Sequence, residues 1–263
     1  MVNSKPKTQN PKPLDVRIAE SPPAVAADAA ELFTQRSQQA ASEGRFYRVA
    51  LSGGSTPRLL YGLLASDTFQ GEIPWGNIQF FFGDERWVPH NHRESNYKMA
   101  RDELFKKIAR EPAGIFPIPT EGLTPEEAAE RYEATLREEF RVKEGETPAF
   151  DLVFLGMGDD GHCASLFPHT PALHERKRLV VANYVEKLSA QRITLTPPVL
   201  QSAREVIFLV TGESKAPALR EVLEGERNPE EYPSQLLHEA KGDVIWFADR
   251  AAAMQLQRKY REV

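Results

Sequence analysis

The sequence predicts an α/β fold: a mostly parallel β-sheet covered by helices on both faces, in a single domain. Two observations carry this prediction. Short, continuous apolar runs recur along the chain, which is typical of strands that are buried on both faces. Segments with helical periodicity separate these runs, and strands that alternate with helices form right-handed βαβ units around a parallel sheet.

The apolar runs give the predicted strands. Six of them are clear: 49–51, 78–82, 152–155, 179–182, 206–210 and 244–247. Two further segments, 14–19 and 192–195, are weaker candidates for the same sheet. Ligands of such sheets bind beyond the carboxyl ends of the strands. The loops that directly follow these runs are therefore the expected place for chemistry.

Three segments between the runs have the period of a helix. Their apolar faces consist of Val25, Ala29, Leu32 and Phe33; of Tyr97, Leu104, Phe105 and Ile108; and of Tyr132, Leu136 and Phe140. The third helix has the clearest start. Thr124 is its predicted N-cap, Pro125 suits the first helical position, and Glu127 completes a capping box.

Composition excludes several classes of protein. The net charge of −5 argues against a broad basic surface for nucleic acid, and no apolar run reaches the roughly 20 residues of a membrane span. Residues 1–13 are rich in Lys, Pro, Asn and Gln and lack the apolar stretch of a secretory signal. We expect them to be a disordered leader before a single domain at 14–263. The one cysteine, Cys163, fits a reducing compartment, so we expect a cytoplasmic protein.

The first candidate loop, Ser52, Gly53, Gly54, Ser55 and Thr56, directly follows a predicted strand. Its two glycines let the backbone approach a ligand, and its hydroxyl groups add hydrogen-bond donors. The loop is expected to end at a helix N-terminus, where free N–H groups and the helix dipole favour a phosphate. The alternative is a simple turn in which Thr56 caps the helix. The Gly-Lys-Ser/Thr ending of a Walker loop is absent.

The second loop places Asp84, Glu85 and Arg86 after the strand at 78–82. Arg86 offers planar, bidentate recognition of a phosphate or an oxyanion. The alternative is a solvated turn in which Arg86 pairs with its acidic neighbours. His90 and His92, nearby, are interpreted as exposed loop histidines rather than metal ligands.

The third loop, residues 156–162, reads Gly-Met-Gly-Asp-Asp-Gly-His and matches the G-x-G-x-x-G pattern of dinucleotide sites. Two carboxylates inside a loop meant for a pyrophosphate, and Pro168 soon after it, argue against a nucleotide. We interpret it as a glycine-shaped loop that presents Asp160 and His162 to a pocket. A carboxylate beside an imidazole fixes its tautomer and suits a general base. Cys163 is interpreted as a buried small residue.

Three further cations follow or precede predicted strands. Lys215 lies in the first turn of a helix after 206–210, where a cation gains nothing from the dipole. This placement indicates an anionic ligand, against the alternative of a solvated lysine. Lys187 and Arg192 are weaker candidates of the same type.

Taken together, these loops resemble the 6-phosphogluconolactonase family. The resemblance rests on five motifs in order: SGGSTP at 52–57, FFGDER at 81–86 with SNY at 95–97, GMGDDGHCASLFP at 156–168, RITLT at 192–196 and GESKA at 212–216. In the related glucosamine-6-phosphate deaminases, a Phe-Asn-Glu-Pro run after the active-site histidine supplies a glutamate that assists opening of the sugar ring. Here Phe167 stands at that position and cannot transfer a proton, so a lactonase is favoured over a deaminase.

The resemblance implies a Rossmann-like fold, no metal or other cofactor, and hydrolysis of 6-phosphoglucono-δ-lactone in the pentose phosphate pathway. It implies that His162 accepts a proton from water, that Asp160 orients His162, and that Arg86 binds anionic charge. The phosphosugar's phosphate is expected on the 52–56 loop. The remaining expected contacts of the substrate are Asp84, Lys187, Arg192 and Lys215. A sugar-phosphate isomerase and a non-catalytic sensor remain as alternatives, and the sequence leaves the oligomeric state open.

Overall fold

Residues 14–263 are described by a computed structural model of the chain, and the predicted leader at 1–13 lies outside them. Eight strands form one sheet in the order β11-β1-β10-β9-β6-β2-β3-β5. These strands are β1 Asp15–Ala19, β2 Tyr47–Leu51, β3 Ile78–Phe82, β5 Gly114–Ile115, β6 Leu152–Gly156, β9 Glu205–Val210, β10 Asp243–Asp249 and β11 Arg261–Glu262. Every pairing in this sheet is parallel, which confirms the predicted fold class.

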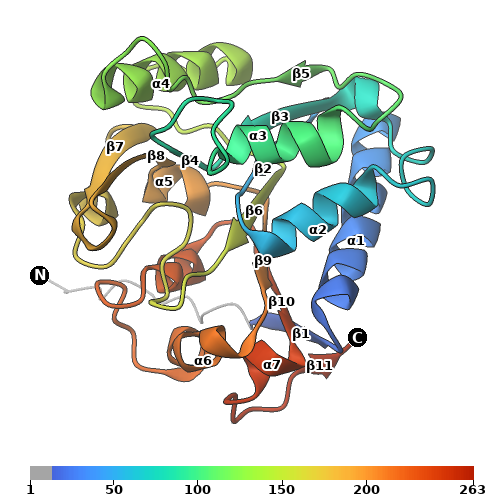
Figure 1. Cartoon of the computed structure of the whole chain (residues 1–263), viewed down its shortest axis with the longest axis vertical. Helices are drawn as coiled ribbons and strands as arrows, with labels where there is room; N and C mark the ends of the chain where they lie inside the picture. Colours follow the sequence, from blue (N-terminus) through green and yellow to red (C-terminus); the bar gives the residue numbers. More distant parts are fainter. Residues whose placement is uncertain (1–13) are drawn as a thin grey trace, which may run out of the picture.

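Helices cover the sheet on both faces. They are α1 Pro22–Ser42, α2 Ser55–Leu64, α3 Asn96–Ala100, α4 Pro125–Phe140, α5 Pro197–Gln201, α6 Ala216–Glu224 and α7 Arg250–Ala253. Figure 1 shows α1 and α2 together on one side of the sheet and α5 on the other. One continuous core of buried apolar residues joins the layers. Within residues 14–263, no helix is long and apolar enough to cross a membrane.

One predicted helix begins where its sequence signals indicate, and another predicted helix differs in length and type. At α4, Thr124 Oγ1 accepts the Glu127 N–H at 3.2 Å, and the Glu127 carboxylate accepts the Thr124 N–H at 2.8 Å, so the capping box is present. The segment carrying Tyr97 and Ile108 was expected to be one helix. It is instead the short helix α3 followed by a π-helical turn, Arg101–Phe105.

Two predicted strands do not join the parallel sheet. Residues 179–182 and 192–195 belong to β7 Val180–Val185 and β8 Ala190–Leu195, which pair antiparallel. Only a short turn, Glu186–Leu188 with Ser189 at φ 47°, connects them. A parallel pair needs a crossover of a dozen or more residues, so this connection permits only a hairpin.

The segment Asp84–Arg86, expected to be a loop, is the third strand of this small sheet. As β4 it pairs antiparallel with β8, which gives the order β4-β8-β7. Figure 1 shows the small sheet on the side of the main sheet that faces away from α1 and α2. Backbone hydrogen bonds therefore fix the direction of these three polar residues.

The strand order reverses between β2 and β6. From β2 the chain continues to its neighbour β3 on one side, whereas β6, β9 and β10 follow on the other side. The loops after β2 and β6 thus diverge at the carboxyl edge of the sheet. This is the place where open α/β sheets bind ligands.

Candidate active site

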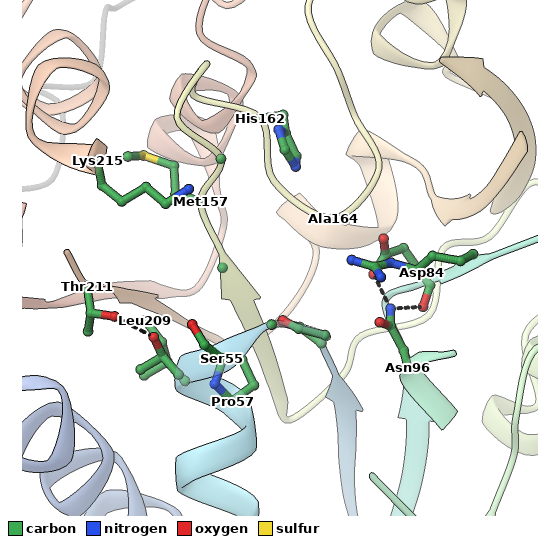
Figure 2. Close-up of a pocket in the computed structure, with 17 residues that line it drawn as sticks. Ser55, Pro57, Asp84, Asn96, Met157, His162, Ala164, Leu209, Thr211 and Lys215 are labelled. Atoms are coloured by element: carbon green, nitrogen blue, oxygen red, sulfur yellow. Dashed lines mark hydrogen bonds between the residues drawn. The ribbon is translucent and has the colours of Figure 1, made fainter. Parts of the chain in front are cut away.

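A cavity of about 240 Å³ opens at the reversal point, and a second cavity of about 300 Å³ adjoins it. The two share Asp84, Arg86, His162 and Ala164 as wall residues. In Figure 2, Lys215 lies on one side of the first cavity, Asp84 and Asn96 lie on the other, and Ser55 lies below. Loops that are far apart in the sequence therefore meet at one site.

The loop after β2 leads directly into the N-terminus of α2, as predicted. The helix begins at Ser55, two residues before Pro57, with Gly54 as its N-cap at φ 114°. A Cβ on Gly53 would lie 2.0 Å from Asn96 Oδ1, so a side chain there would displace Asn96. Thr56 does not cap the helix; its hydroxyl lies 2.7 Å from the Thr211 hydroxyl. The backbone N–H groups of this turn are placed to receive an anion.

Lys215 also lines this cavity, on the side away from Asp84 and Asn96 (Figure 2). It ends a 3₁₀ turn, Glu213–Lys215, and serves as the N-cap of α6. The cation is therefore at a helix N-terminus, as the sequence predicted, where the dipole repels it. Lys187 and Arg192, expected as alternative phosphate contacts, do not reach this cavity and line the second one instead.

The two acidic residues of β4, Asp84 and Glu85, accept hydrogen bonds from other groups of the protein. The Glu85 carboxylate is 1% exposed and accepts hydrogen bonds from the Ser95 hydroxyl and from the backbone N–H groups of Arg86, Asn96 and Tyr97. Burial raises its pKa, although these N–H groups act in the opposite direction. Glu85 therefore fastens the 95–97 turn to β4.

Asp84 also holds the site together. Its Oδ2 accepts the Ser165 hydroxyl at 2.6 Å, and its Oδ1 accepts the Asn96 amide at 3.0 Å, as Figure 2 shows for Asn96. The residue lines both cavities and is only 6% exposed. The contact with Ser165 fastens the loop that carries His162 to the small antiparallel sheet.

Two arginines occupy paired positions on β4 and β8. Arg86 is paired in register with Arg192, and both line the second cavity. Burial and the charge of Arg86 lower the pKa of Arg192. Arg86 donates to the backbone carbonyl of Glu94 at 3.0 Å. Like charges directly opposite are unfavourable in a sheet, so this pair is suited to an anion.

Asp160 and His162 are in direct contact, as the third loop predicted. His162 Nδ1 lies 2.6 Å from Asp160 Oδ1, and Lys187 Nζ lies 2.9 Å from Asp160 Oδ2. Burial would raise the pKa of Asp160, but hydrogen bonds from His162 and Lys187 hold it well below its usual range. The ionised carboxylate only accepts hydrogen bonds, so the His162 tautomer that fits this contact carries its hydrogen on Nδ1 and has its free lone pair on Nε2.

The glycines of this loop make that contact possible. Gly161 has φ 76°, and a Cβ on Gly158 would lie 2.1 Å from His162 Nδ1. Gly158 N–H donates to the His162 carbonyl at 2.9 Å, which closes the loop. The glycines thus give the loop the shape that allows His162 to contact Asp160.

Other reactive side chains are less well placed. Cys163 is fully buried, and burial raises the pKa of its thiol to about 12, which confirms the interpretation as a buried residue. His90 Nε2 lies 2.8 Å from the Ile118 carbonyl. Within residues 14–263, no three His, Cys, Asp or Glu side chains gather as a metal site would require.

Sequence reasoning assigned no contact to Thr211 or Asn96, both of which line the first cavity. Thr211 directly follows β9, so its place after a strand was a usable signal. Asn96 carried no local signal beyond its motif. Its position depends on Glu85, which lies eleven residues earlier and holds the Asn96 N–H.

Comparison with known proteins identifies the family. A family model described as glucosamine-6-phosphate isomerases/6-phosphogluconolactonase matches residues 20–246. The chain belongs to this family. The 6-phosphogluconolactonase of Synechocystis sp. is 42% identical over 85% of this chain and 90% of that protein. The corresponding protein of Rattus norvegicus is 38% identical over 94% and 95%.

A solved structure of the same family agrees. The 6-phosphogluconolactonase from Trypanosoma cruzi superimposes with a TM-score of 0.82 at 30% identity, and the match covers 95% of this chain and all of that one. The match therefore extends over nearly the whole length of both chains. Membership of the glucosamine-6-phosphate isomerase/6-phosphogluconolactonase family thus holds for sequence and architecture alike.

Proposed function

We propose that this chain hydrolyses 6-phospho-D-glucono-1,5-lactone to 6-phospho-D-gluconate, in the oxidative pentose phosphate pathway, with His162 as the general base. The observation that carries the mechanism is the contact between His162 Nδ1 and Asp160 Oδ1 at 2.6 Å, at the wall shared by both cavities. Full-length similarity to proteins named 6-phosphogluconolactonase supports the choice of reaction.

In the first step, a water oxygen attacks the lactone carbonyl carbon while Nε2 of His162 accepts a proton from that water. The carbonyl π electrons move to oxygen and give a tetrahedral oxyanion, which positive charge from Arg86 would stabilise. Asp160 holds the hydrogen on Nδ1 and stabilises the imidazolium that forms.

In the second step, the oxyanion collapses and the bond from the carbonyl carbon to the ring oxygen breaks. The imidazolium returns its proton to that ring oxygen, which becomes a hydroxyl group. The product carboxylic acid then releases its proton to solvent. A lactone is a reactive ester, so this route needs no covalent nucleophile.

The substrate's phosphate is assigned to the 52–56 loop and Lys215. The loop offers N–H donors at the N-terminus of α2, and Lys215 brings a cation to the wall of the same cavity. Arg192 lies in the second cavity beside Arg86 and would add positive charge at the reacting end. We further propose that the enzyme works in the cytoplasm, since its single, buried Cys163 suits a reducing compartment.

A deaminase remains the alternative within the family. The residue that distinguishes the two is Phe167, whose side chain has no proton to transfer at the position of the deaminases' glutamate. A sugar-phosphate sensor needs the phosphate site but gains nothing from a histidine and aspartate held in contact. Neither a deaminase nor a sensor is expected to accelerate hydrolysis of the lactone.

The test measures lactone hydrolysis, corrected for the spontaneous rate, in wild type, His162→Ala and His90→Ala, with EDTA present. We expect wild-type acceleration that EDTA does not remove, a loss of about 10²–10⁴-fold in His162→Ala, and little change in His90→Ala. Folded wild-type protein without acceleration would exclude the lactonase. A fast His162→Ala would leave the reaction in place and remove the base assignment.

A further inference from the structure

Phe167 is held close to His162 by a tight reversal of the chain. Leu166 N–H donates to the Cys163 carbonyl at 3.0 Å, and Ala164 adopts φ 48°. Ser165 anchors the reversal, because its hydroxyl donates to Asp84 and its carbonyl accepts the Asn183 amide at 2.9 Å. The backbone that carries Phe167 is therefore fixed to the small antiparallel sheet.

The Phe167 ring covers one face of the His162 imidazole. Their centroids are 3.8 Å apart and their planes differ by 23°. Aromatic pairs usually lie 4.5–7 Å apart, so this is a close face-to-face contact. Among the ring pairs of residues 14–263, only Phe208 and Trp246 approach as closely, at 3.7 Å. Phe167 is 6% exposed, whereas the His162 side chain keeps 24% exposure toward the cavities.

Asp160 and Phe167 restrain different motions of the imidazole. The hydrogen bond to Asp160 fixes the Nδ1 edge but lets the ring tilt about the line from Nδ1 to Oδ1. The Phe167 face blocks that tilt on one side. The two contacts together therefore restrict the directions in which Nε2 can point.

We propose that Phe167 is a positioning residue for the reaction, because its ring sets the plane of His162 and so directs Nε2 toward the attacking water. The inference rests on the proposed function, in which His162 is the base. It also gives a physical use to the ring at the position where the deaminases have a glutamate. That side chain could not provide an equivalent aromatic face.

Two substitutions test the ring itself. Phe167→Leu keeps an apolar side chain and removes the aromatic face, whereas Phe167→Tyr keeps the face. Phe167 lines cavities of about 300 and 620 Å³, so we expect the tyrosine hydroxyl to be accommodated. We expect kcat to fall about tenfold in Phe167→Leu with KM changed less than about twofold, and to recover in Phe167→Tyr.

A matched control and a spectroscopic signal separate positioning from general loss of stability. Phe208→Leu removes an equally close stack within the core and should leave kcat near the wild-type value. In the NMR spectrum, ring current from Phe167 should displace the His162 imidazole proton signals, which are assigned by their absence in His162→Ala. We expect this displacement in wild type and Phe167→Tyr and its loss in Phe167→Leu.

The outcomes are distinct. Wild-type kcat in a folded Phe167→Leu whose imidazole signals have moved would overturn the inference and leave the lactonase proposal intact. Equal kcat losses in Phe167→Leu and Phe208→Leu would also overturn it. If Phe167→Leu fails to fold, Phe167→Met makes the same comparison. A wild-type protein that does not hydrolyse the lactone would remove the proposed function, and this inference with it.

Discussion

Substitution of Gly158 by alanine tests whether the contact between His162 and Asp160 is required. A Cβ at this position would lie 2.1 Å from His162 Nδ1 and 2.6 Å from Asp160 Oδ1, where ordinary contact begins at 3.4 Å. The imidazole must therefore move by about 1.3 Å. A misplacement of about 1 Å in a catalytic group costs on the order of 10²-fold in rate. We expect kcat in Gly158→Ala to fall at least about 100-fold.

The fold should tolerate the same change. Gly158 is not among the described glycines with positive φ, so alanine can adopt its backbone conformation without strain. The displaced groups are partly exposed and can turn toward the cavity. We expect the free energy of unfolding to change by less than about 1 kcal/mol.

The assay follows acid release from the lactone, corrected for spontaneous hydrolysis, together with urea denaturation of each variant. Gly62→Ala is the matched control, because a Cβ there meets nothing within 4 Å and the residue lies in α2, away from the cavities. It should keep wild-type kcat. A folded Gly158→Ala with wild-type kcat would refute the requirement for the histidine–aspartate contact.

Three further predictions concern stability and reactivity. Ser165→Ala leaves the buried Asp84 Oδ2 without its donor and should lower the free energy of unfolding by about 1.5–3 kcal/mol in urea; an unchanged midpoint would contradict this. Cys163, whose thiol pKa burial raises to about 12, should react with DTNB at pH 8 only after unfolding, and rapid native labelling would refute the assignment. Burial would raise the pKa of Glu133, but hydrogen bonds from Arg137, Leu179 N–H and Arg178 outweigh it and lower the value. This stabilisation is present above the unfolded pKa and is lost as pH falls through the folded pKa. Glu133→Gln should therefore cost about 1–2 kcal/mol at pH 7 and less at a pH below the folded pKa of Glu133, and an equal cost at both would contradict the reasoning.

The sequence predicted the elements that depend on neighbours in the chain. The apolar runs at 78–82 and 206–210 became β3 and β9, and Thr124 with Glu127 began α4. The prediction was wrong where the structure depends on which strands pair with each other. The segment 179–182 has the composition of a buried parallel strand, yet the short turn after β7 places it in an antiparallel hairpin.

The same division applies to the candidate site. The sequence by itself marked most of the loops that line the two cavities, because glycines and polar residues directly after apolar strands are a local pattern, but it assigned no contact to Asn96 or Thr211. Only the tertiary structure decided which charges meet. In the structure Lys187 donates a hydrogen bond to Asp160 and does not reach the 52–56 loop. Arg192 is paired in register with Arg86.

Phe167 shows most clearly what only the fold decides. The sequence indicated that its side chain transfers no proton, which is a property of the residue alone. Its contact with His162 depends on the Cys163–Leu166 reversal and on the anchors of Ser165 to β4 and β7. The chemistry of a side chain depends only on which residue it is, but its direction is set by hydrogen bonds between strands that are distant in sequence.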